Sequence, residues 1–189
     1  MIVEAFVKNM VCNRCIKVLR NELLEAGLDV REVELGRVVY ASENIENDTR
    51  KLHNVLREND FELLQNADKI LVEQVKLSLI KLLEKLPVQK SGTLSSYLSK
   101  ETETDYSRLS RIFSYTENIT LEKYFIKLKI EKVKELIQSR AYNFTEISQL
   151  LDYSNVNYLS RQFKAETGMN LSEYKGLDKN FRNSLDKIV

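Results

Sequence analysis

The sequence predicts an α+β domain at the N-terminus followed by an all-α domain, and three observations carry this prediction. Short β-branched segments alternate with amphipathic helical segments over residues 1–66. From residue 67 onward, apolar residues recur at helical spacing with no strand pattern between them. One helical segment then occurs twice, 50 residues apart, which indicates a duplicated motif inside the second domain.

Composition and charge are compatible with two small domains. The chain has 189 residues, of which 43% are apolar and 30% are charged, as is typical of soluble globular proteins. Residues 1–66 carry 9 lysines and arginines against 12 acidic residues, whereas residues 67–189 carry 20 against 16. These counts predict an acidic first domain and a mildly basic second domain. This asymmetry is too small to establish nucleic-acid binding by itself.

The first domain is predicted to contain six elements in the order βαββαβ, which is the order of a ferredoxin-like fold. Gly27 ends the first helix, Gly36 and Arg37 separate the two strands of a hairpin, and Asp48 is the expected cap of the second helix. The only histidine, His53, falls in the middle of that second helix and is expected at the surface. In chain order, the elements are expected at Ile2–Val7, Asn13–Ala26, Val30–Leu35, Val38–Ala41, Asp48–Asn59 and Phe61–Leu64.

The first loop of this domain carries both cysteines of the chain in the run Met10-Val11-Cys12-Asn13-Arg14-Cys15. With this loop on a βαββαβ frame, residues 1–65 resemble a heavy-metal-associated domain. The resemblance implies that Cys12 and Cys15 bind a soft metal ion, typically Cu(I).

The chemistry of two thiols on one loop agrees with that implication. Thiolates favour Cu(I) over hard cations. Two ligands leave Zn(II) under-coordinated unless a second molecule contributes, so we expect Cu(I) ahead of Zn(II). Cys15, close to a helix start, is expected to have a lowered pKa. Two alternatives remain open: a redox-active CxxC pair, and a metal-free loop on a domain used only for contacts.

Residues 67–87 are predicted to form a connecting helix that Pro87 ends. Its apolar residues step by three and four, as in the a/d seam of a coiled coil. This seam predicts a homodimer contact, and the alternative is an intramolecular core. The seam consists of Val72, Val75, Leu79, Leu82 and Leu86.

The duplicated segment lies in residues 88–177, ahead of a tail at 178–189. LSRIFSYTENITLEKY, which begins at Leu109, aligns without gaps on LSRQFKAETGMNLSEY, which begins at Leu159. Asn118 stands where Gly168 stands, and both residue types tolerate the left-handed conformation that ends a helix. Before the second copy lies another short helix with Thr145 as its expected cap, then a turn at Asp152. Six positions are identical in the two copies: Leu109, Ser110, Arg111, Phe113, Leu121 and Tyr124 match Leu159, Ser160, Arg161, Phe163, Leu171 and Tyr174.

Two short helices across a tight turn, present twice and joined by one long helix, resemble the DNA-binding domain of the AraC family. The resemblance covers roughly Val72 to Leu177 and implies that the second helix of each motif, the recognition helix, reads a major groove. Arg111 and Arg161 occupy equivalent points on these helices, and arginine is the commonest bidentate partner of guanine. The alternative for Arg161 is a surface arginine that pairs with Glu146 or another neighbour. The other candidate DNA contacts are Ser107, Arg108 and Ser110 on the first helix, and Val156, Asn157, Tyr158 and Lys164 on the second.

These patterns predict a DNA-binding transcription regulator that responds to a soft metal ion. The expected partners are double-stranded DNA and a second copy of the chain, with RNA polymerase as a further candidate. The alternative keeps DNA binding but makes the first domain a metal-free dimerisation, ligand-binding or redox-sensing module. A thiol oxidoreductase or metal chaperone would leave the duplicated motif unexplained.

Several other classes are disfavoured. The sequence shows no secretion signal and no apolar run of membrane-spanning length, so a cytoplasmic protein without membrane contact is expected. One histidine, and the lack of a glycine-rich phosphate loop, disfavour an enzyme.

Overall fold

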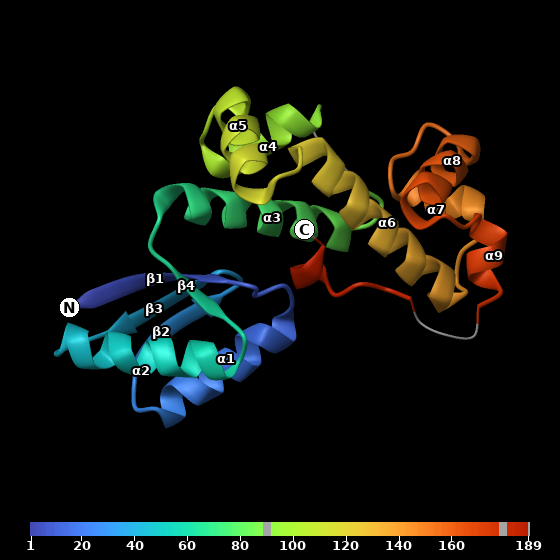
Figure 1. Cartoon of the computed structure of the whole chain (residues 1–189). Helices are drawn as coiled ribbons and strands as arrows, with labels where there is room; N and C mark the ends of the chain where they lie inside the picture. Colours follow the sequence, from blue (N-terminus) through green and yellow to red (C-terminus); the bar gives the residue numbers. More distant parts are fainter. Residues whose placement is uncertain (89–91, 178–180, 189) are drawn as a thin grey trace. The chain divides into compact units, whose positions relative to one another are not determined.

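The structure is a computed structural model that describes residues 1–88, 92–177 and 181–188 (Figure 1). It confirms the predicted fold class, because a four-stranded antiparallel sheet with helices precedes an all-helical region. The chain divides into two compact units, Met1–Leu77 and Ser78–Val189.

The first unit has the sheet order β2-β3-β1-β4, in which every neighbouring pair is antiparallel. Side chains alternate along β1 and β3, so that Ala5, Val7, Val38 and Tyr40 enter the core while their neighbours stay outside. Helices α1 and α2 cover this inner face (Figure 1). The elements are β1 (Ile2–Lys8), α1 (Asn13–Glu25), β2 (Asp29–Glu34), β3 (Arg37–Ala41), α2 (Ile45–Glu58) and β4 (Glu62–Leu64).

Helix α2 begins earlier than the sequence predicted, and its cap is Asn44 rather than Asp48. Asn44 has an extended backbone, and its side chain accepts a hydrogen bond from the Asn47 N–H at 3.1 Å. Asp48 already lies inside the helix, where its carboxylate accepts from the Ser42 hydroxyl at 2.7 Å. His53 is exposed on α2, as predicted.

Helix α3 (Ala67–Glu84) starts in the first unit and continues into the second. Val72, Val75, Leu79 and Leu82 are all buried, with at most 6% of each residue exposed. Burial of these four residues is compatible with the intramolecular alternative, while Leu86, the last seam residue, is only half-buried. The structure gives no support to a homodimer contact through this seam, and that contact stays a prediction.

Within the described residues, every secondary-structure element of the second unit is a helix, and loops connect these helices. Helix α6 connects the two helical motifs and has 19 residues, so it is about 28 Å long. The sequence also predicts a short loop at Lys90–Thr93, part of which falls on residues 89–91, outside the described residues. The helices are α4 (Leu94–Thr102), α5 (Tyr106–Glu117), α6 (Leu121–Ser139), α7 (Phe144–Leu150), α8 (Val156–Thr167) and α9 (Leu171–Lys175), followed by a 3-10 turn at Leu185–Lys187.

Candidate nucleic-acid interface

The two recognition helices, α5 and α8, each pack through a phenylalanine–tyrosine pair, and the two pairs occupy equivalent positions. The ring centroids of Phe113 and Tyr124 lie 5.2 Å apart, and those of Phe163 and Tyr174 lie 5.4 Å apart. All four rings are buried, as are Leu109 and Leu159. The first turn of α6 therefore packs on α5 as α9 packs on α8. Leu109 and Phe113, and their identical counterparts Leu159 and Phe163, thus form the core of the two motifs.

The first recognition helix begins at a charged cap. One carboxylate oxygen of Asp105 accepts hydrogen bonds from the backbone N–H of Ser107 at 2.8 Å and of Arg108 at 3.4 Å. The Ser107 hydroxyl also donates to this carboxylate, and this bond followed by the backbone bonds lowers the pKa of Asp105. A fixed negative charge thus stands at the start of α5.

The second recognition helix begins at a neutral cap. The Asn155 side chain accepts from the Tyr158 N–H at 2.9 Å, so the dipole of α8 meets no acidic group at its cap. In the preceding turn, Asp152 has a φ of 55°, the left-handed conformation expected there. The left-handed helix ends predicted at Asn118 and Gly168 are present as well.

The cap of α7 is Asn143, and the expectation for Thr145 was wrong. Asn143 accepts from the Glu146 N–H at 2.9 Å, and the Glu146 carboxylate accepts from the Asn143 N–H at 2.7 Å. This reciprocal capping box satisfies two backbone donors, whereas Thr145 already lies inside the helix. Asn170 and Glu173 repeat it at α9. The Asn-x-x-Glu spacing at both helices is the sequence signal for these caps.

The candidate contact residues form one outward face on each recognition helix. Ser110 and Val156 are half-buried, because each lies at the edge of its motif's core. No ion pair links Arg111 or Arg161 to an acidic residue within the described part of the chain, and Glu146 is engaged in its capping box. The Arg161 guanidinium lies 5.9 Å from the centre of the Tyr158 ring. The other candidates are exposed: Ser107, Arg108 and Arg111 on α5, and Asn157, Tyr158, Arg161 and Lys164 on α8.

A buried lysine on α6 supports the turn of the second motif. The Lys129 ammonium lies 3.6 Å from the centre of the Tyr153 ring, within range of a cation–π interaction. Tyr153 is 8% exposed, its hydroxyl has no hydrogen-bond partner among the residues described, and burial raises its pKa. Sequence reasoning missed Lys129, because a lysine on a helix ordinarily indicates a solvent-exposed face.

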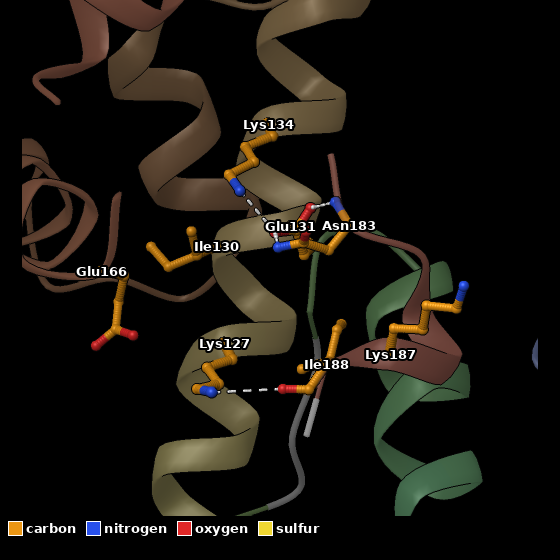
Figure 2. A pocket seen from close by; sticks show the side chains of 8 residues that line it. All are labelled: Lys127, Ile130, Glu131, Lys134, Glu166, Asn183, Lys187 and Ile188. Atoms are coloured by element: carbon orange, nitrogen blue, oxygen red, sulfur yellow. Dashed lines mark hydrogen bonds and ion pairs between the residues drawn. The ribbon is translucent and has the colours of Figure 1, made fainter. Parts of the chain in front are cut away.

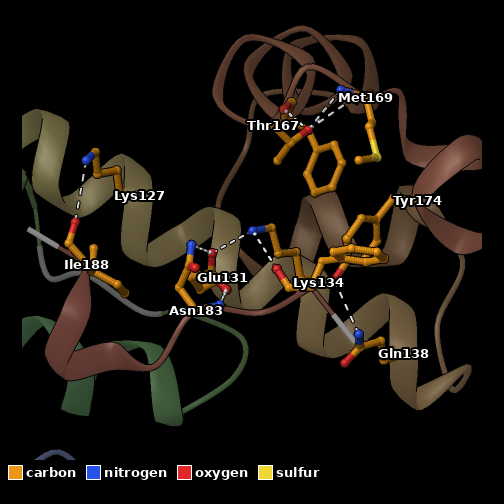
Figure 3. Close-up of polar contacts among 11 residues, drawn as sticks. Lys127, Glu131, Lys134, Gln138, Thr167, Met169, Tyr174, Asn183 and Ile188 are labelled. Carbon is orange, nitrogen blue, oxygen red and sulfur yellow. Dashed lines mark hydrogen bonds and ion pairs between the residues drawn. The ribbon is translucent and has the colours of Figure 1, made fainter. Parts of the chain in front are cut away.

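The C-terminal segment 181–188 packs along α6 (Figure 3). The buried Glu131 carboxylate accepts from the Lys134 ammonium at 2.6 Å, the Asn183 N–H at 2.9 Å and the Asn183 side-chain amide at 3.1 Å. The Lys127 ammonium donates to the backbone oxygen of Ile188 at 3.4 Å, and Ile188 is buried. The described part of the tail therefore belongs to the second unit.

A cavity of about 350 Å³ lies between α6, the end of α8 and this segment (Figure 2). Both of its acidic residues are already paired, Glu131 with Lys134 and Glu166 with Lys123. The Lys187 ammonium points away from the other lining side chains (Figure 2). Because the cationic groups do not converge on one point, the cavity lacks the arrangement of an anion-binding site.

In the first unit, the Cys12 and Cys15 sulfurs lie 3.4 Å apart, and both thiols are free. Cys12, at the N-cap of α1, has a lowered pKa: burial raises it, but this is outweighed by hydrogen bonds from the Cys15 backbone and thiol and by the Arg14 backbone and charge. Burial raises the pKa of Cys15. The helix start thus favours the Cys12 thiolate, and the expectation of a lowered pKa for Cys15 was wrong.

Comparison with known protein families gives a match within the helical region. Residues 98–176 match a family model described as a helix-turn-helix domain. This match supports a DNA-binding transcription regulator related to the AraC family, a class that is generally not enzymatic. It does not extend to the first unit, so the resemblance to a heavy-metal-associated domain stays a prediction. Searches of curated proteins and of solved structures each gave no match. Among the described residues, no helix is both long and apolar enough to cross a membrane.

Proposed function

We propose that this chain is a sequence-specific regulator of transcription that reads double-stranded DNA through α5 and α8. The observation that carries the proposal is the duplication itself. Two recognition helices rest on equivalent aromatic pairs, and each turns a polar face to solvent inside the region that matches the helix-turn-helix family. Such a helix in a major groove brings side chains near its N-terminus to base edges.

The exposed side chains suggest a division of roles. Arg111 and Arg161 would each pair with a guanine, and Asn157 with an adenine. Lys164, farther along α8, would contact phosphate and so contribute affinity without sequence preference. Ser107, Arg108, Ser110, Val156 and Tyr158 would complete the two faces.

The length of α6 is compatible with contacts in two successive major-groove segments. These segments recur about 34 Å apart on one face of DNA. A connecting helix of about 28 Å, with recognition helices packed near it, can span this distance. Both motifs would then bind one continuous site.

For the first unit, we propose that Cys12 and Cys15 bind one Cu(I) ion. The two sulfurs lie 3.4 Å apart on one loop, so both thiolates could hold one ion, and thiolate ligands favour Cu(I) over hard cations. Within the described residues, no group of three or more His, Cys, Asp or Glu is placed to hold a metal ion, which argues against Zn(II).

The same sulfur distance supports a second candidate. Two free thiols 3.4 Å apart, one with a lowered pKa, can form a disulfide when a peroxide oxidises them. The first unit would then sense redox state without metal. A third candidate is a metal-free module for ligand binding or dimerisation. In that case neither Cu(I) nor peroxide changes the affinity for DNA.

One experiment separates these forms. A DNA site is selected from random sequences with the full-length protein, and its affinity is measured with Cu(I), Zn(II), a chelator and hydrogen peroxide. The Cys12→Ser/Cys15→Ser variant is the control. A metal response requires that the ion bind the DNA-competent and incompetent conformations unequally, and a tenfold change in affinity needs only about 1.4 kcal/mol of coupling.

The outcomes differ clearly. A shift with Cu(I) that the double variant loses supports the metal site, and a shift with peroxide alone supports the redox site. Equal affinity under all conditions supports the metal-free module. Failure to select any DNA, or to bind it at low salt, contradicts the DNA-binding role itself.

A further inference from the structure

We propose that Glu122 and Lys123, in the first turn of α6, hold both recognition helices and thereby set the half-site spacing that the protein accepts on DNA. We call these two residues and their partners, Tyr106 and Glu166, the α6 clasp. The inference rests on the proposed DNA-reading function, because spacing has meaning only if both motifs bind one site.

The clasp consists of two side-chain contacts from neighbouring residues. The Tyr106 hydroxyl, on the first residue of α5, donates to the Glu122 carboxylate. The next residue, Lys123, forms an ion pair with Glu166 in the last turn of α8. The Glu166 side chain is only 13% exposed, so its charge is partly withdrawn from water and depends on this partner. One turn of α6 is thus bonded to both recognition helices.

The electrostatics of the first contact agree with a formed hydrogen bond. Burial, followed by the bond to Glu122, raises the pKa of Tyr106. The hydrogen bond from Tyr106 in turn lowers the pKa of Glu122. The phenol therefore stays protonated and the carboxylate ionised near neutral pH, and a charge-assisted hydrogen bond links them.

The repeat shows that the clasp is not part of the motif's own core. In the gapless alignment, Val156 stands at the position of Tyr106, and Ser172 stands at the position of Glu122. Valine and serine cannot form an equivalent charge-assisted bond, yet the second motif keeps its aromatic pair and its helices. A motif folds without this contact. The clasp therefore serves the relation between the motifs.

The second contact breaks the symmetry in the same way. Glu173 stands at the position of Lys123 and completes the capping box of α9, while Thr116 stands at the position of Glu166. The ion pair between Lys123 and Glu166 therefore has no counterpart between Glu173 and Thr116, the residues at the equivalent positions of the repeat. The Tyr106–Glu122 bond fixes α5 to the first turn of α6, and the Lys123–Glu166 ion pair joins that same turn to the second copy.

A fixed relation between the recognition helices restricts the DNA sites that both can read. Each inserted base pair moves the second half-site by about 3.4 Å and rotates it by about 34° around the DNA axis. Rigid helices cannot follow this change, whereas loosely held helices follow it in part. Loss of the clasp should therefore relax spacing preference, with affinity for a single half-site unchanged.

The test uses the full-length protein and its selected DNA site, with one base pair inserted or deleted between the two half-sites. The variant is Tyr106→Phe/Lys123→Met, which removes a hydroxyl and a charge but keeps side-chain bulk. The control is Lys132→Met, which removes an ion pair between two residues of α6, Lys132 and Glu135. Thermal unfolding verifies that each protein is folded.

We expect the preference of the clasp variant for the original spacing to fall about two- to fivefold, the range of partly exposed charge interactions. The control should keep the wild-type preference. The exchanged pair Lys123→Glu/Glu166→Lys should restore spacing preference relative to either single variant. A clasp variant with unchanged preference, or an exchange that restores nothing, overturns the clasp. A wild-type protein that binds no DNA overturns the proposed function and this inference with it.

Discussion

The two helix-turn-helix motifs of this chain share an interior and differ at their surfaces. Phe113 on Tyr124 and Phe163 on Tyr174 are equivalent contacts, with ring centroids 5.2 and 5.4 Å apart and interplanar angles of 50° and 72°. Their recognition helices nevertheless begin at different caps, Asp105 in the first motif and Asn155 in the second. The second turn is supported by a buried lysine–tyrosine contact, whereas Glu103 stands at the position of Tyr153 and is exposed.

The shared interior stabilises each motif, whereas the differing surfaces determine what each motif binds. A close-packed core tolerates few changes in volume, so equivalent core positions keep the same residues. An exposed face has no such constraint and can differ between the copies. The two motifs should therefore be equally important for stability and unequal in their contacts with DNA.

The largest expected effect tests the shared interior. Phe113→Ala and Phe163→Ala should each lower the free energy of unfolding by about 3–5 kcal/mol, because each leaves a cavity under a recognition helix. Urea unfolding followed by circular dichroism measures both. Tyr115→Ala, at a side chain that is 89% exposed, is the control and should change stability by less than about 0.5 kcal/mol. Unequal losses in the free energy of unfolding for the two variants would contradict the equivalence of the two interiors.

The next effect compares the two faces on DNA. Arg111→Ala and Arg161→Ala should each cost about 1–3 kcal/mol and relax preference at a different base pair. Lys164→Ala should weaken binding to all sequences and reduce the salt dependence, since it removes a phosphate contact. Affinities on the selected site and on single-base variants measure both effects. Equal losses on selected and random DNA would rule out base reading by these arginines.

A smaller effect concerns the turn of the second motif only. Lys129→Met should destabilise this motif by about 0.5–2 kcal/mol, because the cation–π contact with Tyr153 is lost. Hydrogen exchange should show faster opening of α7 and α8 than of α4 and α5. Tyr153→Phe is the matched control: it keeps the ring, removes a buried hydroxyl without a hydrogen-bond partner in the described part of the chain, and should be neutral or stabilising. Equal opening of both motifs would contradict the asymmetry.

The smallest effect comes from the helix caps. Aspartate and asparagine cap helices about equally well, so exchanging them changes charge with little change in helix stability. Asp105→Asn should raise DNA affinity by about two- to fivefold at low salt, because a negative charge facing phosphates is removed. Asn155→Asp should lower it by a similar factor. Fluorescence anisotropy at several salt concentrations measures both, and responses of the same sign would contradict the predicted difference.

Much of this protein followed from the sequence alone, and the successes share a local cause. Strand alternation, helical periodicity and the left-handed helix ends at Asn118 and Gly168 depend on neighbours within a few residues. The duplicated core was visible because both copies lie in one chain. The errors at Asp48 and Thr145 were also local: a better cap, Asn44 or Asn143, lay just upstream.

Other features were decided only by tertiary structure. The apolar seam of α3 could pack against a second chain or within its own chain, and the sequence pattern is the same in both cases. The burial of its residues is a feature of the tertiary structure. Lys129 and Glu131 look like surface residues in the sequence, yet a ring at position 153 and an amide at 183 complete their environments. The α6 clasp likewise joins residues up to 43 positions apart. Periodicity reports which face of a helix is apolar, but what that face meets depends on distant segments.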